Sequence, residues 1–217
     1  MTVEDFVLDD IVEALETSSD YWNRRKLIQQ ENNKNPVTRR GLALTPVKFG
    51  ISFTATWFNQ AGALLHIYKD GSVHLNHGGT EMGQGLFTKV AQVVATALGL
   101  PIEQIKISAT RTDKVPNTSA TAASSGADLN AMAARNAAIV LKKRLSSFAA
   151  RHFKIDAESL RFEDGKIDLG DQSISFSKLV ELAYMNRVQL SATGFYRTPK
   201  IHYDRKNAKG RPFYYFA

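Results

Sequence analysis

The sequence predicts an α+β fold, in which helices and mixed β-sheets alternate without a regular βαβ repeat. Two Asp-Gly dipeptides, Asp70-Gly71 and Asp164-Gly165, each lie between strand-like runs and predict antiparallel hairpins. Two long segments of helical periodicity, 86–98 and 127–153, separate these hairpins. This order favours α+β over a doubly wound fold, and it is compatible with two lobes.

The chain begins with two predicted helices. Thr2 is a candidate N-cap for an acidic helix from Val3 to about Leu15, and Ser19 for a second helix from Asp20 to about Glu31. We expect the Asn-rich stretch that ends at Pro36 to break the second helix.

Strands and one helix are predicted for the next part of the chain. Residues 42–55 are strand-like, as are 63–69 and 72–77 on either side of the first Asp-Gly turn. A helix is predicted for 86–98, because its apolar residues recur at helical spacing. Residues 105–110 are predicted to form the next strand.

The long helix 127–153 has a predicted narrow, close-packing face. It consists of Leu129, Met132, Ala133, Asn136, Ile139 and Val140, together with the stretch from Ala133 to Ala138. A hairpin of 159–162 with 166–169 comes next, followed by a helix that Ser175 or Ser177 begins and that ends near Met185. Residues 188–196 are the last strand before the C-terminal region.

The aromatic run Phe213-Tyr214-Tyr215-Phe216-Ala217 is strand-like and ends without a turn, a cap or a polar tail. This ending predicts that residues 1–217 are an internal piece of a larger domain. Composition marks no internal boundary within the piece.

Composition restricts the class of protein. The 217 residues, 43% of them hydrophobic, are enough for a substantial core. The absence of cysteine excludes disulfides, thiolate zinc sites and a cysteine-held iron–sulfur cluster in this chain. No apolar run approaches the roughly 18 residues of a membrane span, and the acidic start of the chain is unlike a secretory signal. We therefore expect a cytoplasmic protein with no membrane partner.

The formal net charge of +7 raises the possibility of nucleic-acid binding, which the distribution of charge argues against. The basic residues form separate patches at 24–26, 39–40, 142–144 and 197–211, and no nucleic-acid motif accompanies them. Solvated faces and a subunit contact explain such patches better, so we expect no nucleic-acid partner.

A glycine-rich loop connects the first hairpin to helix 86–98, and its sequence is His77-Gly78-Gly79-Thr80-Glu81-Met82-Gly83-Gln84-Gly85. The N–H groups at a helix N-terminus are free and carry partial positive charge, so we expect this place to suit an anion or an oxo group. Gln84 projects an amide between two glycines, which leaves the backbone open to a ligand; a purely local loop role for this amide is the alternative.

A second run of small side chains, 115–126, enters the long helix in the same way. Two small-residue loops that both enter helices can offer their amides to one ligand from two sides.

Together these segments resemble the molybdopterin-binding region of the xanthine dehydrogenase and aldehyde oxidase family of molybdenum hydroxylases. The similarity is carried by 77–85, by Val115-Pro116-Asn117-Thr118 and by Thr121-Ala122-Ala123-Ser124, in the same order and at similar spacing. It extends upstream through 49–54 and downstream through 193–199.

The resemblance implies which residues form the site. Gly83, Gln84, Ala122, Ala123, Ser124 and Ser125 would contact molybdopterin with its molybdenum, and Phe53 and Thr54 would contact a purine such as xanthine or hypoxanthine. An aromatic ring holds a flat heterocycle without using its polar edges. Glu81 matches no family base, and a capping role is expected for it.

The resemblance further implies oxidative hydroxylation of a purine, with water as the oxygen source. The family's glutamate base lies in a Gly-Glu-Pro-Pro setting that this chain lacks, so no catalytic residue is expected here and the piece alone should be inactive. The 2Fe-2S clusters and FAD belong to partner domains or subunits, and the rest of the molybdenum subunit is a further expected partner.

Two alternatives stay open on the sequence. One is a molybdenum hydroxylase that acts on an aldehyde, nicotinate or another heterocycle, against which Phe53 and Thr54 argue. The other is a folded module without catalytic function that stabilises a partner.

Overall fold

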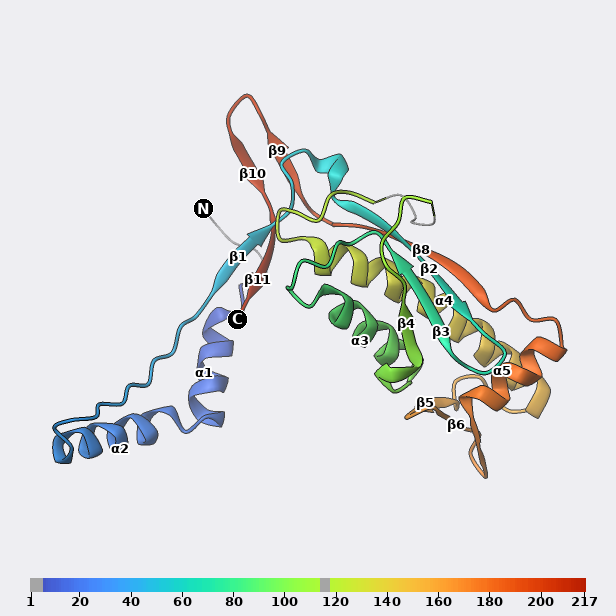
Figure 1. Cartoon of the computed structure of the whole chain (residues 1–217), viewed down its shortest axis with the longest axis horizontal. Helices are drawn as coiled ribbons and strands as arrows, with labels where there is room; N and C mark the ends of the chain where they lie inside the picture. Colours follow the sequence, from blue (N-terminus) through green and yellow to red (C-terminus); the bar gives the residue numbers. More distant parts are fainter. Residues whose placement is uncertain (1–5, 114–117) are drawn as a thin grey trace. The chain divides into compact units, whose positions relative to one another are not determined.

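A computed structural model describes residues 6–113 and 118–217 (Figure 1). The chain divides into two compact units: a terminal unit of residues 1–51 and 212–217, and a central unit of residues 52–211. Helices alternate with parallel and antiparallel strand pairs along the described residues. The predicted α+β class is therefore confirmed.

The terminal unit contains helices α1 (Leu8–Ser18) and α2 (Tyr21–Lys34) and a two-stranded antiparallel sheet. In that sheet β1 (Lys48–Ile51) pairs with β11 (Phe213–Phe216). The predicted aromatic strand is thus confirmed. The predicted strand 42–55 is shorter than expected, because only four of its residues have ladder partners in β11.

One predicted cap of the first two helices is wrong, and the end of the second helix is shifted. Ser19 ends α1, its N–H bonded to the carbonyl of Leu15, and so it does not cap α2. Helix α2 ends within the Asn-rich stretch, as expected, but at Lys34, three residues later than predicted. Asn35 has the extended conformation that a following proline requires. The predicted cap Thr2 lies outside the described residues.

The central unit is built on a four-stranded sheet with the strand order β4-β3-β2-β8. Strands β2 (Gln60–Ile67) and β3 (Val73–His77) form the predicted hairpin. Strand β8 (Ser191–Arg197) pairs antiparallel with β2 on the other side, and β4 (Ile105–Ile107) pairs parallel with β3. This arrangement places the C-terminal end of β3, where the glycine loop begins, inside the sheet.

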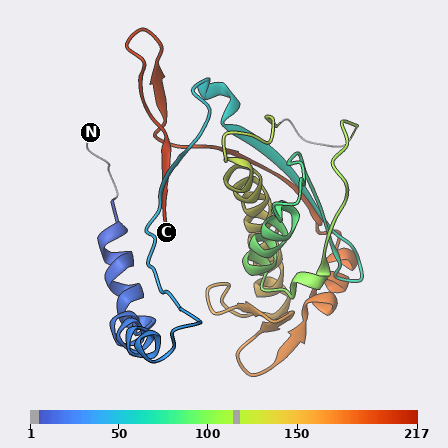
Figure 2. The ribbon, with the colours of Figure 1, turned by 60° about the vertical axis from the view of Figure 1, so that its left-hand side comes forward.

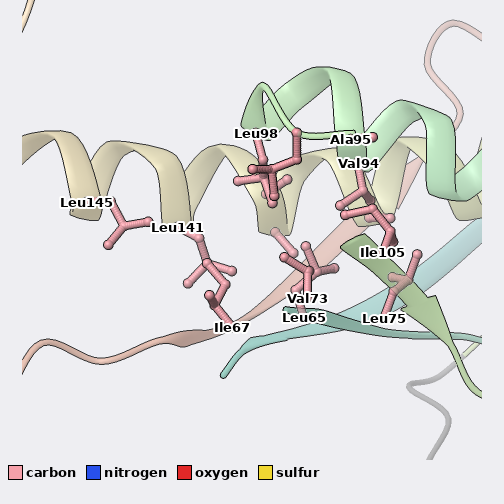
Figure 3. Packing of buried hydrophobic residues seen from close by; sticks show 14 of the residues in the cluster. Leu65, Ile67, Val73, Leu75, Val94, Ala95, Leu98, Ile105, Leu141 and Leu145 are labelled. Atoms are coloured by element: carbon pink, nitrogen blue, oxygen red, sulfur yellow. The ribbon is translucent and has the colours of Figure 1, made fainter. Parts of the chain in front are cut away.

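Helices α3 (Leu86–Leu98) and α4 (Gly126–Phe153) pack against each other and cover one face of this sheet (Figure 2). Figure 3 shows the apolar side chains between the layers, which come from both helices and from the inward positions of the strands. Burial of this surface is the main stabilising contribution to the unit. The fully buried residues include Leu65, Val73, Leu75, Val94, Leu98 and Leu141.

Helix α4 packs through part of its predicted narrow face. The alanines of the predicted stretch 133–138 are buried, as expected, whereas Ile139 and Val140, also predicted to be inward, are 41% and 43% exposed. The alanines allow a close approach to β8: a Cβ added to Gly194 would lie 2.0 Å from the carbonyl oxygen of Ala133. At Gly194 the backbones of α4 and β8 are therefore in direct contact.

A small three-stranded sheet and a further helix follow α4 in the chain. Strands β5 (Arg161–Glu163) and β6 (Lys166–Asp168) form the second predicted hairpin, and β7 (Ser173–Ser175) adds a strand that was not predicted. Ser175 caps α5 (Phe176–Met185), as expected, by accepting the N–H of Lys178.

Short elements complete the unit. The hairpin of β9 (His202–Asp204) with β10 (Lys209–Arg211) was also not predicted. Two 3-10 turns, η1 (Thr56–Phe58) and η2 (Ile102–Gln104), precede β2 and β4. Of the helices in the described ranges, none is both long and apolar enough to cross a membrane.

Candidate functional site

The glycine loop begins at a buried histidine, which is the last residue of β3. His77 is 2% exposed; its Nδ1 accepts the N–H of Gly79 at 3.1 Å, and the ring meets that of Phe87 edge to face at 5.1 Å. Burial lowers the pKa of His77 to about 4, so the ring is neutral near pH 7. Since Nδ1 accepts a hydrogen bond, the proton lies on Nε2.

The next part of the loop is organised around Glu81. Its Oε1 accepts the N–H groups of Gly83 and Gly85 at 2.8 and 3.0 Å, and its Oε2 accepts that of Phe87 at 3.0 Å. These bonds, that from Phe87 first, hold the pKa of the Glu81 carboxyl below its ordinary value. The expected capping role of Glu81 is confirmed.

This arrangement corrects one expectation. The sequence suggests that the N–H groups where the loop enters α3 are free to bind an anion, but the Glu81 carboxylate occupies those of Gly83, Gly85 and Phe87. A protein carboxylate therefore already supplies the negative charge that stabilises this helix end.

Gln84 is exposed at the outer side of the loop. Its Oε1 accepts the N–H of Met82 at 2.6 Å, and its Nε2 donates to the carbonyl of Thr80 at 2.9 Å. A carboxamide nitrogen carries two N–H groups, so one donor remains beyond the bond to Thr80. A Cβ added at Gly83 or Gly85 would meet no atom within 4 Å, so the space beside both Cα atoms is open to a ligand, although both N–H groups are bonded to Glu81.

The second loop reaches α4 through two residues in an unusual conformation. Ala123 and Ser124 both have φ of 53°, the left-handed region, which costs a non-glycine residue about 1–2 kcal/mol. Ser125 is buried and donates its hydroxyl to the carbonyl of Ala122 at 2.9 Å. The motif residues 115–117 lie outside the described residues.

The two loops meet. The N–H of Thr80 donates to the hydroxyl of Thr121 at 2.8 Å, which joins the glycine loop to the second loop across 41 positions of sequence. Between them lies a pocket of about 300 Å³. It is lined by Met82, Gln84, Leu86, Lys89, Thr121, Ala122, Ser124, Gly126 and Ala127.

The structure therefore brings Gln84, Ala122 and Ser124 to one pocket. Gly83, Ala123 and Ser125 adjoin these residues in sequence without lining the pocket. Sequence reasoning missed Lys89, although its position three residues after Leu86 places both side chains on one helical face.

The residues of the expected substrate motif lie outside this pocket. Phe53 is half-buried and Thr54 is exposed. A direct link to the second loop exists nearby, since the N–H of Ser52 donates to the carbonyl of Ala123 at 3.3 Å. The motif is thus attached to the loop that lines the pocket.

Sequence reasoning also missed Asn59, whose side chain is hydrogen-bonded to the backbone of Phe53. Asn59 is 2% exposed, and its side chain bonds both the N–H and the carbonyl of Phe53. An Asn six residues after Phe53 gives no signal in the sequence, because its role depends on how the chain turns back towards Phe53. Within the described part of the chain, no group of three or more His, Asp or Glu residues is arranged to hold a metal ion.

Comparison with known proteins identifies similar sequences. A family model described as "Molybdopterin cofactor-binding domain" matches residues 14–217. Xanthine dehydrogenase/oxidase of Gallus gallus and xanthine dehydrogenase of Blastobotrys adeninivorans are each 45% identical over 215 residues, which is 99% of this chain. The chain spans 14% of the length of each of these relatives.

Solved structures share the fold at lower identity. Quinoline 2-oxidoreductase from Pseudomonas putida 86 has a TM-score of 0.64 at 17% identity, over 100% of this chain and 31% of that one. A Cu,Mo-CO dehydrogenase has a TM-score of 0.62 at 23% identity, over 94% of this chain and 26% of that one.

Proposed function

We propose that this chain supplies part of the cofactor and substrate site of a xanthine dehydrogenase. The premise is that the chain belongs to the family of molybdopterin cofactor-binding domains. The observation that carries the proposal is the convergence of the two loops on one pocket, with Gln84 on one side and Ala122 and Ser124 on the other. The 45% identity to xanthine dehydrogenases over 99% of the chain supports this choice of enzyme.

The residues present fit part of a molybdopterin. Small side chains of the second loop leave room for a bulky group, the space beside the Cα atoms of Gly83 and Gly85 is open, and Lys89 adds a positive charge at the pocket. Gln84 and Ser124 would offer hydrogen bonds, Gly83 and Ala122 close backbone contact, and Ala123 and Ser125 would hold the shape of the second loop. The bound cofactor would supply the redox chemistry of purine hydroxylation.

The substrate part of the proposal rests on Phe53 and Thr54. The half-buried ring of Phe53 offers a flat apolar surface, and the exposed Thr54 offers a hydroxyl to a polar edge. The Ser52 bond to Ala123 connects this motif to the cofactor loop. We infer a flat purine such as xanthine or hypoxanthine as the substrate.

Other parts of the reaction belong outside this chain. Glu81 is committed to three backbone N–H groups and has a lowered pKa, so it is unsuited to be the general base. We propose that the base lies elsewhere in the molybdenum subunit. Iron–sulfur and FAD domains or subunits would carry the electrons away.

Replacement of Gln84 tests the cofactor site. In the molybdenum-loaded enzyme that contains this chain, Gln84→Ala should lower xanthine turnover by at least about tenfold, since a positioned donor at the reacting centre is lost. The circular dichroism spectrum should not change, because Gln84 is exposed and outside the core.

Gln92→Ala is the matched control: Gln92 is an exposed amide within α3, eight residues after Gln84 and outside the pocket. It should leave turnover unchanged. If Gln84→Ala retained full turnover and full molybdenum content by mass spectrometry, Gln84 would have no place in the site.

A further inference from the structure

The ring of Phe53 is oriented by backbone hydrogen bonds, without support from the main core. Among the described residues, Phe53 lies outside the hydrophobic core cluster and outside the apolar side chains packed on it. The ring has a tilted contact with Phe58, with centroids 5.5 Å apart, and Phe58 is itself 46% exposed. The direction of the ring therefore depends on how its own backbone is held.

One side chain holds that backbone. Asn59 Oδ1 accepts the N–H of Phe53 at 2.7 Å, and Asn59 Nδ2 donates to the carbonyl of Phe53 at 3.0 Å. The second amide N–H of Asn59 reaches the carbonyl of Thr56 at 3.1 Å. Two bonds to one residue fix both of its peptide planes, as a paired strand would.

Asn59 is itself fixed to the rest of the central unit. Its carbonyl accepts the N–H of Thr198 at 3.1 Å, just after β8. The Thr198 hydroxyl lies 3.3 Å from the carboxylate of Asp128, in the first turn of α4. This chain of contacts leads from Phe53 to the helix that follows the second loop.

We propose that Asn59 is a positioning residue that sets the direction of the Phe53 ring, and thereby the preference of the enzyme for a flat heterocycle over a small aldehyde. The inference rests on the proposed function, because it takes Phe53 to be a wall of the substrate site. Asn59 does not touch the substrate in this proposal and acts only through Phe53.

The test uses Asn59→Asp in the molybdenum-loaded enzyme. Aspartate keeps the shape and the acceptor but cannot donate to the carbonyls of Phe53 and Thr56. The quantity measured is the ratio of kcat/KM for xanthine to kcat/KM for acetaldehyde. This ratio does not depend on the fraction of enzyme that is folded and loaded, so a loss of stability alone leaves it unchanged.

The ratio should fall on the order of fivefold to tenfold in Asn59→Asp. The donated bond to the Phe53 carbonyl is lost, and the ring that this bond orients contacts, in this proposal, only the flat substrate. Gln60→Ala is the matched control. Gln60 is the neighbouring amide, which donates to the carbonyl of Trp57 at 2.7 Å without touching Phe53. The control should leave the ratio unchanged.

A double-mutant cycle with Phe53→Ala separates a positioning role from a structural one. Phe53→Ala should lower the ratio by about tenfold or more, and Asn59→Asp added to it should lower the ratio no further. Equal losses for both substrates in Asn59→Asp, or additive effects in the double variant, would overturn the positioning role and leave the proposed function standing.

An unchanged ratio in Phe53→Ala would instead remove Phe53 from the substrate wall, and with it both the substrate proposal and this inference. If Asn59→Asp does not accumulate, Asn59→Ser provides the same comparison, because a serine hydroxyl cannot span the two bonds to Phe53. A normal ratio in Asn59→Ser would then count against the inference.

Discussion

The buried His77 should make the stability of this chain depend on pH in a defined range. Its pKa is about 4 in the folded chain, against an ordinary value of 6.5, because burial disfavours the charged ring. Between these two values the unfolded chain binds more protons than the folded one, so acid favours unfolding. The stabilising effect of the neutral ring is complete above pH 6.5 and is lost as the pH falls towards 4.

The magnitude follows from the two pKa values. Each pH unit between them corresponds to about 1.4 kcal/mol, so the full effect is about 3 kcal/mol and the part lost between pH 7.5 and pH 5 is about 2 kcal/mol. His77→Asn is a suitable reference, since an Asn Oδ1 can accept the N–H of Gly79 but does not titrate.

The assay is urea unfolding of the 217-residue chain at pH 7.5 and pH 5, followed by circular dichroism. The other titrating groups are common to both proteins, so the difference in their pH dependence isolates His77. The unmodified chain should lose about 2 kcal/mol more than the variant over this range. The same loss in both proteins would show that His77 is not held neutral by burial.

Other predictions concern packing, the loop and activity. Gly194→Ala should lower the free energy of unfolding by about 2–4 kcal/mol, because the new Cβ would lie 2.0 Å from the Ala133 carbonyl oxygen; an unchanged urea midpoint would refute the close approach of α4 to β8. Leu141→Ala, in the centre of the core, should cost about 2–5 kcal/mol in the same assay, and a loss below 1 kcal/mol would contradict its burial. Glu81→Gln should lower Tm and speed amide exchange at Gly83, whereas unchanged exchange would mean that the carboxylate does not hold the loop. The purified 217-residue chain should hold no stoichiometric molybdenum and oxidise no xanthine with an artificial acceptor, and metal with turnover would refute an incomplete site.

Local patterns in the sequence were sufficient to predict the elements whose formation depends on residues close together in the chain. Helix 86–98 has the predicted bounds, because its apolar spacing and the glycines at both ends act within a few residues. The two Asp-Gly hairpins are likewise as predicted. The capping role of Glu81 was accessible for the same reason, since all of its partners lie within six positions of it.

Only the tertiary structure decided features that depend on long-range contacts. Ile139 and Val140 are exposed although apolar, because the approach of α4 to β8 at Gly194 selects the alanine face. The pocket lies between two loops that are far apart in sequence and are joined by the Thr80–Thr121 hydrogen bond. The amide of Asn59 likewise acquires its role only because the chain turns back towards Phe53. Residue types and spacings indicate which groups can bind a ligand, whereas the packing of distant segments determines which of them meet.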